Sequence, residues 1–295
     1  MSNPHPLVLC FGEILWDFLP GGLFLGGASL NAAYHLNRQG AEARVVSAVG
    51  RDVLGDELLR RCAGWGLATD HITRLDDAPT GYVRVTVGGN GDAKFDIASD
   101  VAWDKISADA GTLQAAARAD ALIFGSLAQR TAGNRTTLDR LLGALPATAL
   151  RVFDANLRPP YDDLALVREL ARKATLIKVN SAEAARLAGD ADTPGREEAH
   201  ARALAAETGC GIIVVTAGAR GAGLLRDGRW IWEPGRPVTV VDTVGAGDAF
   251  IASLVAHLPA GKFSDAEILA RSCRLGEWVA SRAGATPACD SSAPS

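Results

Sequence analysis

The segment DTVGAGDAF occupies residues 242–250. An apolar, β-branched run, Val238 to Val241, leads into it. After it, Phe250, Leu254 and Val255 are spaced like the buried face of a helix. The pattern predicts a strand, then a turn of small residues, and then the start of a helix.

Gly245, Ala246 and Gly247 lie in the predicted turn, and none of them carries a bulky side chain. A ligand can therefore approach the backbone closely, and the free amides at a helix N-terminus favour an anion. Asp248 follows in the same turn. A carboxylate repels phosphate, but it can accept a proton from a hydroxyl group that attacks phosphate. A glycine-rich turn in which Asp248 is only an N-terminal helix charge fits the nine residues equally well.

Length and composition favour one large α/β domain, or one domain with a small appendage. The chain has 295 residues, 48% of them hydrophobic, with a net charge of −4 and a pI near 5.8. This mild acidity argues against a partner held by a basic surface, such as nucleic acid or a membrane. The five cysteines form no Cys-x-x-Cys pair, and no apolar run approaches the length of a membrane span. We expect a cytoplasmic protein with reduced cysteines.

Strand and helix patterns alternate along most of the chain. Strands are expected at 7–11, 43–50, 121–124, 150–153, 175–179 and 211–216. Helices are expected at 54–65, 135–145, 161–172, 181–187, 196–208 and 264–283, and residues 222–233 have the pattern of a closing hairpin. Repeated strand–helix units predict a three-layer, doubly wound α/β fold, with a mainly parallel sheet covered on both faces.

One region interrupts this alternation. Short alternating runs at 71–73, 80–87 and 93–98 are separated by the turn-forming segments 76–79 and 88–92. No helix fits between these runs, so we expect a small antiparallel sheet, which residues 22–25 can join. The chain is then a single domain over residues 1–295 with lid strands within 14–25 and 71–100, although a plain hairpin excursion fits the same pattern.

Polar residues cluster directly after three of the predicted strands. The clusters are Asp154–Arg158, Asn180–Glu183 and Thr216–Gly221. Because ligands bind at the carboxyl ends of strands in open α/β sheets, the three clusters predict one binding edge. Asn180 and Glu183 also fit a helix capping box, which is a purely structural reason for the same two residues.

Two motifs resemble the signatures of one protein family. Residues 26–33, GGASLNAA, resemble the N-terminal signature of the ribokinase-like (PfkB) carbohydrate kinases, and residues 242–250 resemble the C-terminal signature. Both motifs are long, they come in the right order, and the resemblance extends over nearly the whole chain. It implies an ATP-dependent sugar kinase in which Asp248 is the catalytic base. The amides of Gly245, Ala246 and Gly247 would form an anion hole for the transferred phosphoryl group.

The resemblance also implies which residues bind the sugar. Asp17 would accept hydrogen bonds from two neighbouring hydroxyls, as an ionised carboxylate can. Gly26 and Gly27 would let the sugar lie near the backbone, and Asn31 could donate to and accept from a hydroxyl. Arg158 would contact a phosphate or a substrate oxygen. As alternatives, Asn31 fits an ordinary polar surface position, and Asp17 fits the polar face of an exposed strand.

For the nucleotide, the resemblance implies a site made of Asn180, Glu183, Thr216, Gly218, Gly221, Gly245 and Gly247. Glu183 would hold Mg²⁺ through water, which suits an ion that keeps several of its waters. Asp242 could contribute to a monovalent-cation site for K⁺, beside a loop at 284–287 that borders the adenine. The small sheet would be a lid over the sugar, and it could also pair two copies of the chain as a homodimer.

Other classes of protein fit the motifs less well. A nicotinamide-dependent oxidoreductase needs Gly-x-Gly-x-x-Gly after the first strand, where this chain has Gly12-Glu13-Ile14. A P-loop kinase needs Gly-x-x-x-x-Gly-Lys before Ser or Thr, but Phe263 follows the one Gly-Lys pair. A non-catalytic sugar-binding module is a third class. The presence of Asp248 together with both glycines of the turn, Gly245 and Gly247, argues against it.

Fructose is the sugar that the resemblance favours. The segments 12–20, 26–27 and 154–158 look most like those of fructokinases, whereas Ser29 stands where many fructokinases have proline. The alternative substrates are 2-keto-3-deoxygluconate, ribose and a nucleoside, and the last of these would favour a more aromatic lid.

Overall fold

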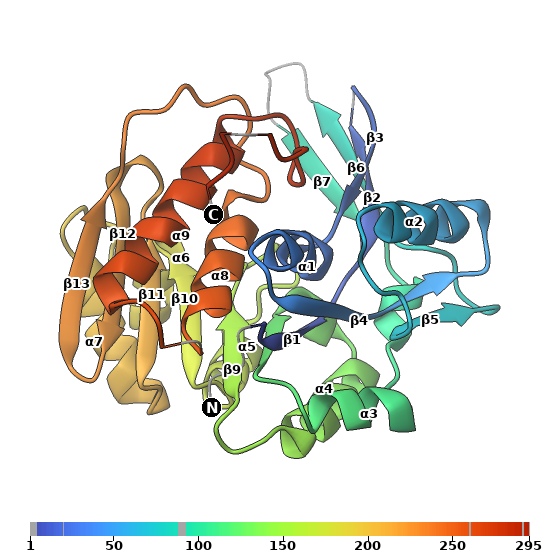
Figure 1. The fold of residues 1–295 in the computed structure, drawn as a ribbon, viewed down its shortest axis with the longest axis horizontal. Helices are drawn as coiled ribbons and strands as arrows, with labels where there is room; N and C mark the ends of the chain where they lie inside the picture. The colour runs from blue at the N-terminus through green and yellow to red at the C-terminus, as the bar shows by residue number, and fades with distance from the viewer. Residues whose placement is uncertain (1–4, 20, 88–92, 260, 291, 295) are drawn as a thin grey trace.

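The large sheet is the scaffold of the protein. The computed structural model describes residues 5–19, 21–87, 93–259, 261–290 and 292–294. In this part of the chain nine strands form the sheet in the order β13-β12-β11-β10-β9-β8-β1-β4-β5 (Figure 1). β12 and β13 are antiparallel at one edge, and the other strands run parallel. The bounds are β1 (Leu7–Phe11), β4 (Glu42–Gly50), β5 (Ile72–Leu75), β8 (Ala121–Gly125), β9 (Leu150–Asp154), β10 (Leu176–Asn180), β11 (Ile212–Thr216), β12 (Gly221–Arg226) and β13 (Arg229–Pro234).

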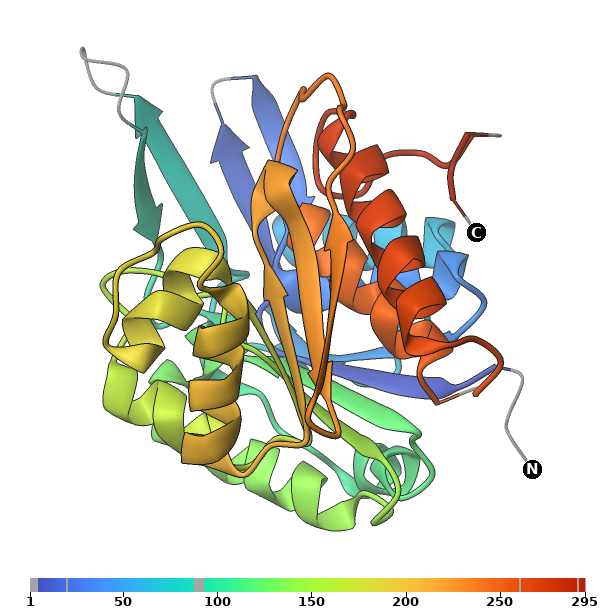
Figure 2. The ribbon, with the colours of Figure 1, turned by 90° about the vertical axis from the view of Figure 1, so that its left-hand side faces the viewer.

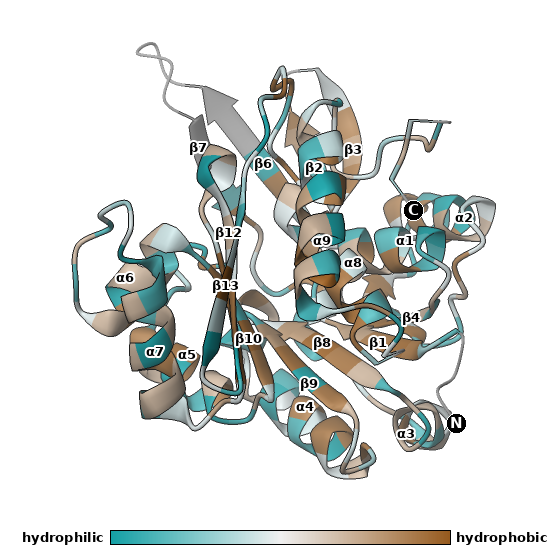
Figure 3. Ribbon diagram, turned by 60° about the vertical axis from the view of Figure 1, so that its left-hand side comes forward, coloured by the Kyte–Doolittle hydropathy of each residue, from teal (hydrophilic) through white to brown (hydrophobic). Residues whose placement is uncertain are grey.

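Helices cover both faces of this sheet, so the predicted three-layer, mainly parallel α/β fold is confirmed (Figures 1 and 3). One face carries α1 (Ala28–Arg38), α2 (Val53–Gly64), α8 (Ala246–His257) and α9 (Asp265–Ala280). The other carries α3 (Ala110–Ala116), α4 (Ala132–Ala144), α5 (Leu164–Ala171), α6 (Ser181–Ala188) and α7 (Glu197–Thr208). Short 3₁₀ helices also join these elements: η1 (Ala102–Lys105), η2 (Leu127–Arg130) and η3 (Gly218–Arg220).

Two apolar layers fill the space between the sheet and its helices. In β1, Leu9 and Phe11 pack in the layer of α3 to α7, whereas Val8 and Cys10 pack in the layer of the other four helices. Strands that are buried on both faces are apolar along their whole length, which is why short apolar runs located them correctly. All five cysteines are free thiols, and Cys289 is the exposed one.

A smaller sheet projects beyond the carboxyl end of the large one (Figure 2). Its strands, in the order β3-β2-β6-β7, are β2 (Leu15–Leu19), β3 (Gly22–Gly26), β6 (Tyr82–Val87) and β7 (Ala93–Ile97). The predicted small sheet is therefore confirmed, with residues 22–25 in it. β2–β3 and β6–β7 are antiparallel, and the β2–β6 pairing that joins the two hairpins is parallel. The predicted turn at 88–92 lies outside the described residues.

Residues 71–73 were expected in the small sheet, and this expectation is wrong. Their strand, β5, is the edge strand of the large sheet and pairs parallel with β4, with Ile72 opposite Ser47. The physical reason is the preceding helix α2, which supplies the crossover that a parallel neighbour needs. The short polar run was ambiguous because an exposed edge strand alternates in the same way as a strand of a half-solvated sheet.

The predicted strand at Val238–Val241 is also wrong. This segment forms no strand, and it runs along the end of α9, where the amide of Val241 donates to the carbonyl oxygen of Ala280 at 2.9 Å. The exposed fractions of Val240 and Val241 are 57% and 60%. β-branched residues favour strands only where a neighbouring strand and a buried face are available, and β13 already ends the sheet on this side.

α8 is the helix that brings the signature segment 242–250 to the carboxyl end of the sheet. It is apolar on nearly all sides because it packs between α1, α9 and the sheet. Phe250, Leu254 and Val255 are buried, as predicted. None of the helices in the described part of the chain combines the length and hydropathy that crossing a membrane requires.

Candidate active site

The segment 242–250 forms a turn and the first turn of α8. Gly245 is the N-cap residue, and its φ of 78° is a left-handed conformation that suits glycine. A Cβ at this position would also lie 2.5 Å from the Cβ of Ala285. No side chain of the described residues caps α8, and the amide of Ala246 donates to the carbonyl oxygen of Thr243 at 3.3 Å. The amides of Gly245 and Gly247 have no partner among the described residues, so they can bind an anion.

Asn31 and Asp248 bring the two signature motifs into contact. Asn31 lies in α1 with an exposed fraction of 4%, so it is not an ordinary surface residue. Its Nδ2 donates to Oδ2 of Asp248 at 2.8 Å. Its Oδ1 is buried and has no partner among the described residues. A buried acceptor without a partner is costly, so this oxygen fits a ligand that supplies a donor, such as a sugar hydroxyl.

Asp17 lies on β2 beside the residues that lead into α1. A Cβ on Gly26 would overlap Oδ2 of Asp17, so glycine at this position makes room for the carboxylate. Burial raises the pKa of Asp17 to about 6, although the positive charge of Arg158 opposes this change. Arg158 is exposed, and its guanidinium donates to the carbonyl oxygen of Leu157 at 3.1 Å. The structure thus brings Asp17 and Arg158 within electrostatic range of each other.

Glu13 lies in the same region, and the sequence did not single it out as a site residue. It is buried, and its Oε1 accepts from the amide of Ala28 at 3.2 Å. Burial raises the pKa of Glu13, and hydrogen bonds from the backbone only partly offset this. Gly27 has a φ of 103°, and a Cβ there would overlap the carbonyl oxygen of Glu13. The Gly26-Gly27 pair is therefore required by packing as well as by any ligand.

A buried ion pair joins the cluster Asp154–Arg158 to β10. Nζ of Lys178 lies 3.1 Å from both carboxylate oxygens of Asp154, and both side chains are less than a tenth exposed. Burial raises the pKa of Asp154, although the ammonium group opposes it. Burial alone would lower the pKa of Lys178, but the surrounding carboxylates outweigh this and raise it. Lys178 therefore keeps its positive charge inside the site.

Glu183 forms a capping box with Asn180 and also holds the neighbouring cluster. Its Oε2 accepts from the amide of Asn180 at 2.9 Å, and the amide of Glu183 donates to Oδ1 of Asn180 at 2.9 Å. Its Oε1 accepts from the amide of Leu157 at 2.8 Å. The structural interpretation of this motif is thus confirmed. A contact from Glu183 to Mg²⁺ through water stays a prediction, since each oxygen already accepts one backbone hydrogen bond.

Thr216 and the two glycines after it form the third cluster at the same edge. Thr216 ends β11 directly opposite Asn180 in β10. Gly218 and Gly221 have φ values of 56° and 117°, which suit glycine. A Cβ on Gly221 would overlap the carbonyl oxygen of Glu233 in β13, so close backbone packing requires this glycine.

Asp242 ties the signature turn to the segment 284–287. Its Oδ1 accepts from the amide of Val244 at 3.0 Å, and its Oδ2 accepts from the amide of Gly284 at 3.1 Å. Among the described residues, no group of three or more His, Cys, Asp or Glu side chains is arranged to hold a metal ion. A K⁺ site beside Asp242 therefore stays a prediction.

Helix α1 holds the same segment from the other side. The hydroxyl of Tyr34 donates to the carbonyl oxygen of Pro287 at 2.7 Å, and Nε2 of His35 donates to that of Ala285 at 2.8 Å. These partners lie about 250 residues away along the chain, so no local sequence pattern could show them. Ala285 also backs Gly245, so these bonds help to position the turn.

Lys178 and Glu13 are the charged residues that the sequence analysis missed. Lys178 interrupts the apolar strand Leu176–Asn180, and a charged residue inside a buried strand is a signal that could have found it. Glu13 comes two residues after β1, at the edge where ligands bind in such sheets. Neither residue belongs to the two signature motifs.

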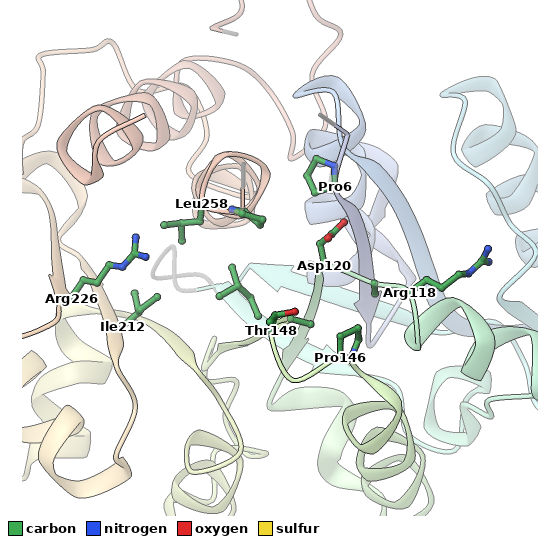
Figure 4. Close-up of a pocket in the computed structure, with 12 residues that line it drawn as sticks. Pro6, Arg118, Asp120, Pro146, Thr148, Ile212, Arg226 and Leu258 are labelled. Carbon is green, nitrogen blue, oxygen red and sulfur yellow. The ribbon is translucent and has the colours of Figure 1, made fainter. Parts of the chain in front are cut away.

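A separate cavity of about 380 Å³ lies at the amino ends of the strands, away from these residues (Figure 4). Asp120 and Arg226 are among the residues that line it. Oδ2 of Asp120 accepts from the amide of Leu7 at 2.8 Å, and Arg226 pairs with Asp265 at 2.8 Å. These two charged groups are already engaged in structural contacts, and none of the predicted site residues lines the cavity.

Comparison with known proteins assigns the chain to a family. Residues 21–294 match the pfkB family of carbohydrate kinases. The chain is 28% identical to a fructokinase of Rhizobium leguminosarum bv. trifolii over 278 residues, which cover 85% of this chain and 79% of the relative. It is 27% identical to a ribokinase of Mus musculus over 246 residues, covering 79% and 71% of the two chains.

Among solved structures, a fructokinase of Xylella fastidiosa with bound ATP has the same fold, with a TM-score of 0.81 and 23% identity. The likeness covers 98% of this chain and 95% of the other. Two signature motifs that meet at the open N-terminus of α8 agree with this assignment. The protein belongs to the pfkB family of carbohydrate kinases, and it is a phosphotransferase that acts on a sugar hydroxyl.

Proposed function

We propose that this protein is a fructokinase that transfers the γ-phosphoryl group of MgATP to a hydroxyl of fructose. The observation that carries the proposal is the 2.8 Å contact between Asn31 and Asp248 at the start of α8. In this contact the carboxylate of Asp248, which can accept a proton, is bound by Nδ2 of Asn31. The amide oxygen of Asn31, Oδ1, has no partner among the described residues. A sugar hydroxyl that fills this position lies next to both the proton acceptor and the open amides.

The proposed reaction needs one proton transfer and one displacement. The sugar hydroxyl oxygen attacks the γ-phosphorus, its proton passes to Asp248, and ADP leaves with the electrons of the broken phosphorus–oxygen bond. The amides of Gly245, Ala246 and Gly247 stabilise negative charge on the transferred group. Asn31 holds the carboxylate of Asp248 in place, so that it faces the attacking oxygen.

The sugar is proposed to lie between Asn31, Asp17 and Arg158. The carboxylate of Asp17 can accept from two hydroxyls at once, and its partial burial strengthens such bonds. Gly26 leaves the space in which this carboxylate sits. Arg158 is exposed at the carboxyl end of β9, so it can close over a bound sugar or phosphate.

ATP and Mg²⁺ fit the donor groups at this edge. Asn180, Glu183, Thr216, Gly218 and Gly221 come from the ends of two adjacent strands, and the N-terminus of α8 supplies amides for phosphate. Mg²⁺ would supply positive charge to the phosphates, and Glu183 would hold it through water. Asp242 would contribute to a K⁺ site beside the signature turn. The fructokinase with bound ATP supports the choice of nucleotide.

The choice of fructose rests on the segments that resemble fructokinases and on the relative of that name. Ribose, 2-keto-3-deoxygluconate and a nucleoside are the alternatives, and the ribokinase relative keeps ribose among them. The test is a panel of these four substrates with MgATP and coupled detection of ADP, in wild type and in Asp248→Asn. We expect the highest kcat/KM for fructose and little ADP from the variant.

Each other result of this panel has a definite meaning. A higher kcat/KM for one of the other three substrates would replace fructose. ADP formation that does not depend on any sugar, or none at all, would contradict the proposed reaction. The variant controls for contaminating kinases, because they would release ADP in both preparations.

We also propose that two copies of the chain pair through the small sheet. Its strands β2 and β3 carry four large apolar residues that are about two-fifths exposed: Phe18, Leu19, Leu23 and Phe24. Adjacent exposed apolar residues of this size favour a protein partner over solvent. A second copy would cover them and close the lid over each sugar site.

A further inference from the structure

Lys178 is a charged residue beside the first turn of α8 that the proposed reaction does not use. If Gly247 carried a Cβ, that atom would lie 2.9 Å from Nζ of Lys178. The ammonium group therefore lies beside the backbone of Gly247 at the start of α8. This contact gives Gly247 a role of its own, because any larger residue there would displace the ammonium.

The fold fixes this ammonium firmly. Lys178 lies two residues before the end of β10, on the face of the sheet that α8 covers. Its side chain is 8% exposed, and both of its hydrogen bonds among the described residues go to Asp154. An ammonium group has three donors, so one donor is left for a further acceptor.

The charges around the turn explain why a cation is needed there. Among the described residues whose charges act on one another at this edge, carboxyl groups outnumber cations. The carboxyl groups are Glu13, Asp17, Asp154, Glu183 and Asp248, and the cations are Arg158 and Lys178. Such a field repels the phosphates of a nucleotide. Of the two cations, only Lys178 is buried beside the turn.

We infer that Lys178 is an electrostatic component of the phosphoryl-transfer site, whose ammonium stabilises the transferred group across the backbone of Gly247. The inference rests on the proposed function, since it assigns the transferred group to this turn. It makes Lys178 a positioning residue that acts through the turn. The competing role is structural, in which the ammonium only neutralises the buried carboxylate of Asp154.

A comparison of D154N with the double variant D154N/K178M separates the two roles. Both proteins lack the carboxylate of Asp154, so neither needs a cation to neutralise it, and they differ in the ammonium alone. Methionine keeps the length and apolar stem of the lysine side chain. We expect kcat to be at least about tenfold lower in the double variant than in D154N, since removing a single donor from such an anion site typically costs more.

Binding supplies a second readout that a structural role would not move. MgADP with aluminium fluoride and fructose mimics the transferred group, and its affinity is measured by calorimetry for both variants. The double variant should bind this mimic at least about tenfold more weakly than D154N, with a much smaller change for fructose alone. Thermal unfolding shows whether both proteins are folded, and K178Q, which also removes the charge, replaces K178M if the double variant is not.

Equal kcat and equal affinity for the mimic in the two folded variants would overturn the inference. The proposed function fails separately, if wild type releases no ADP with any sugar of the panel. In that case the affinities for MgADP with aluminium fluoride still show whether Lys178 contributes to an anion site at this turn.

Discussion

Asp17 makes a quantitative prediction about the pH dependence of sugar use. Burial raises its pKa from 3.8 to about 6, so its carboxylate is lost as the pH falls through 6. With this pKa, roughly 97% of the groups are ionised at pH 7.5 and roughly 9% at pH 5. If the sugar needs the ionised form, kcat/KM for the sugar at saturating MgATP should fall about tenfold between these two pH values. A carboxyl with an ordinary pKa would lose less than about a tenth of its charge over the same range.

The assay is steady-state ADP release from pH 5 to 7.5 in wild type, Asp17→Asn and Asp76→Asn. Asp76 is a matched control, since its side chain is 82% exposed in a surface ion pair with Arg51. The Asp17→Asn variant should have a lower kcat/KM that no longer changes near pH 6, and the control should behave like wild type. A flat profile in wild type, or a profile near pH 6 that persists in Asp17→Asn, would refute the reasoning.

The same raised pKa has a consequence for stability. A carboxyl whose pKa is higher in the folded state favours folding when it is protonated, and this contribution is lost as the pH rises from 3.8 to about 6. Asp17→Asn should therefore raise the free energy of unfolding at pH 7.5, by up to about 3 kcal/mol, with a smaller gain at pH 4.5. Chemical denaturation at the two pH values measures this difference. An Asp17→Asn protein that is less stable than wild type at pH 7.5 would contradict the assigned burial.

Three further predictions concern other parts of the site and the lid. Asp248→Asn keeps an oxygen that can accept a hydrogen bond from Nδ2 of Asn31, but it cannot take up the proton of the sugar hydroxyl. We therefore expect kcat to fall at least about 10²-fold while calorimetry still detects binding of MgATP and sugar. Near-normal turnover in the folded variant would exclude Asp248 as the base. Arg158→Ala should raise the sugar KM or lower kcat. The melting temperature should change little, because the Arg158 side chain is exposed and bonds only to Leu157 among the described residues. Unchanged kinetics would exclude Arg158 from the site. The double variant Leu23→Ser/Phe24→Ser should shift the protein toward monomer in sedimentation. The control Val53→Ser, which removes an apolar side chain on α2 that is 82% exposed, should cause no such shift. A double variant that stays dimeric, or a wild type that is monomeric, would argue against the lid interface.

The motifs and the strand pattern predicted the fold because both are local signals. Buried parallel strands are continuous apolar runs, and the two signatures mark the starts of α1 and α8. The strand expected at 238–241 does not form, because β-branched residues pair only where a partner strand is available, and a local pattern does not show that partner. Residues 71–73 were misplaced for the same reason, since register and neighbours depend on the crossover helix.

The candidate site could be predicted residue by residue but not as an arrangement. The sequence placed Asn31 and Asp248 in separate motifs and gave each a role toward a sugar hydroxyl, but it did not show that the two side chains contact each other. A lysine inside an apolar strand marks Lys178 as unusual, but only the fold shows that Asp154 and Gly247 lie beside it. Packing also gives the Gly26-Gly27 pair a reason that the motif alone did not suggest.

Helix α1 also fixes the position of the Asp248 carboxylate relative to the amide turn at Gly245. Asn31 contacts Asp248, the proposed proton acceptor. His35, one turn later in α1, bonds to the carbonyl oxygen of Ala285, which lies against Gly245. One rigid helix therefore fixes the carboxylate and the amide turn relative to each other. In-line transfer depends on that relative position to within fractions of an ångström, and a site built on packed helices holds it better than one built on loops alone.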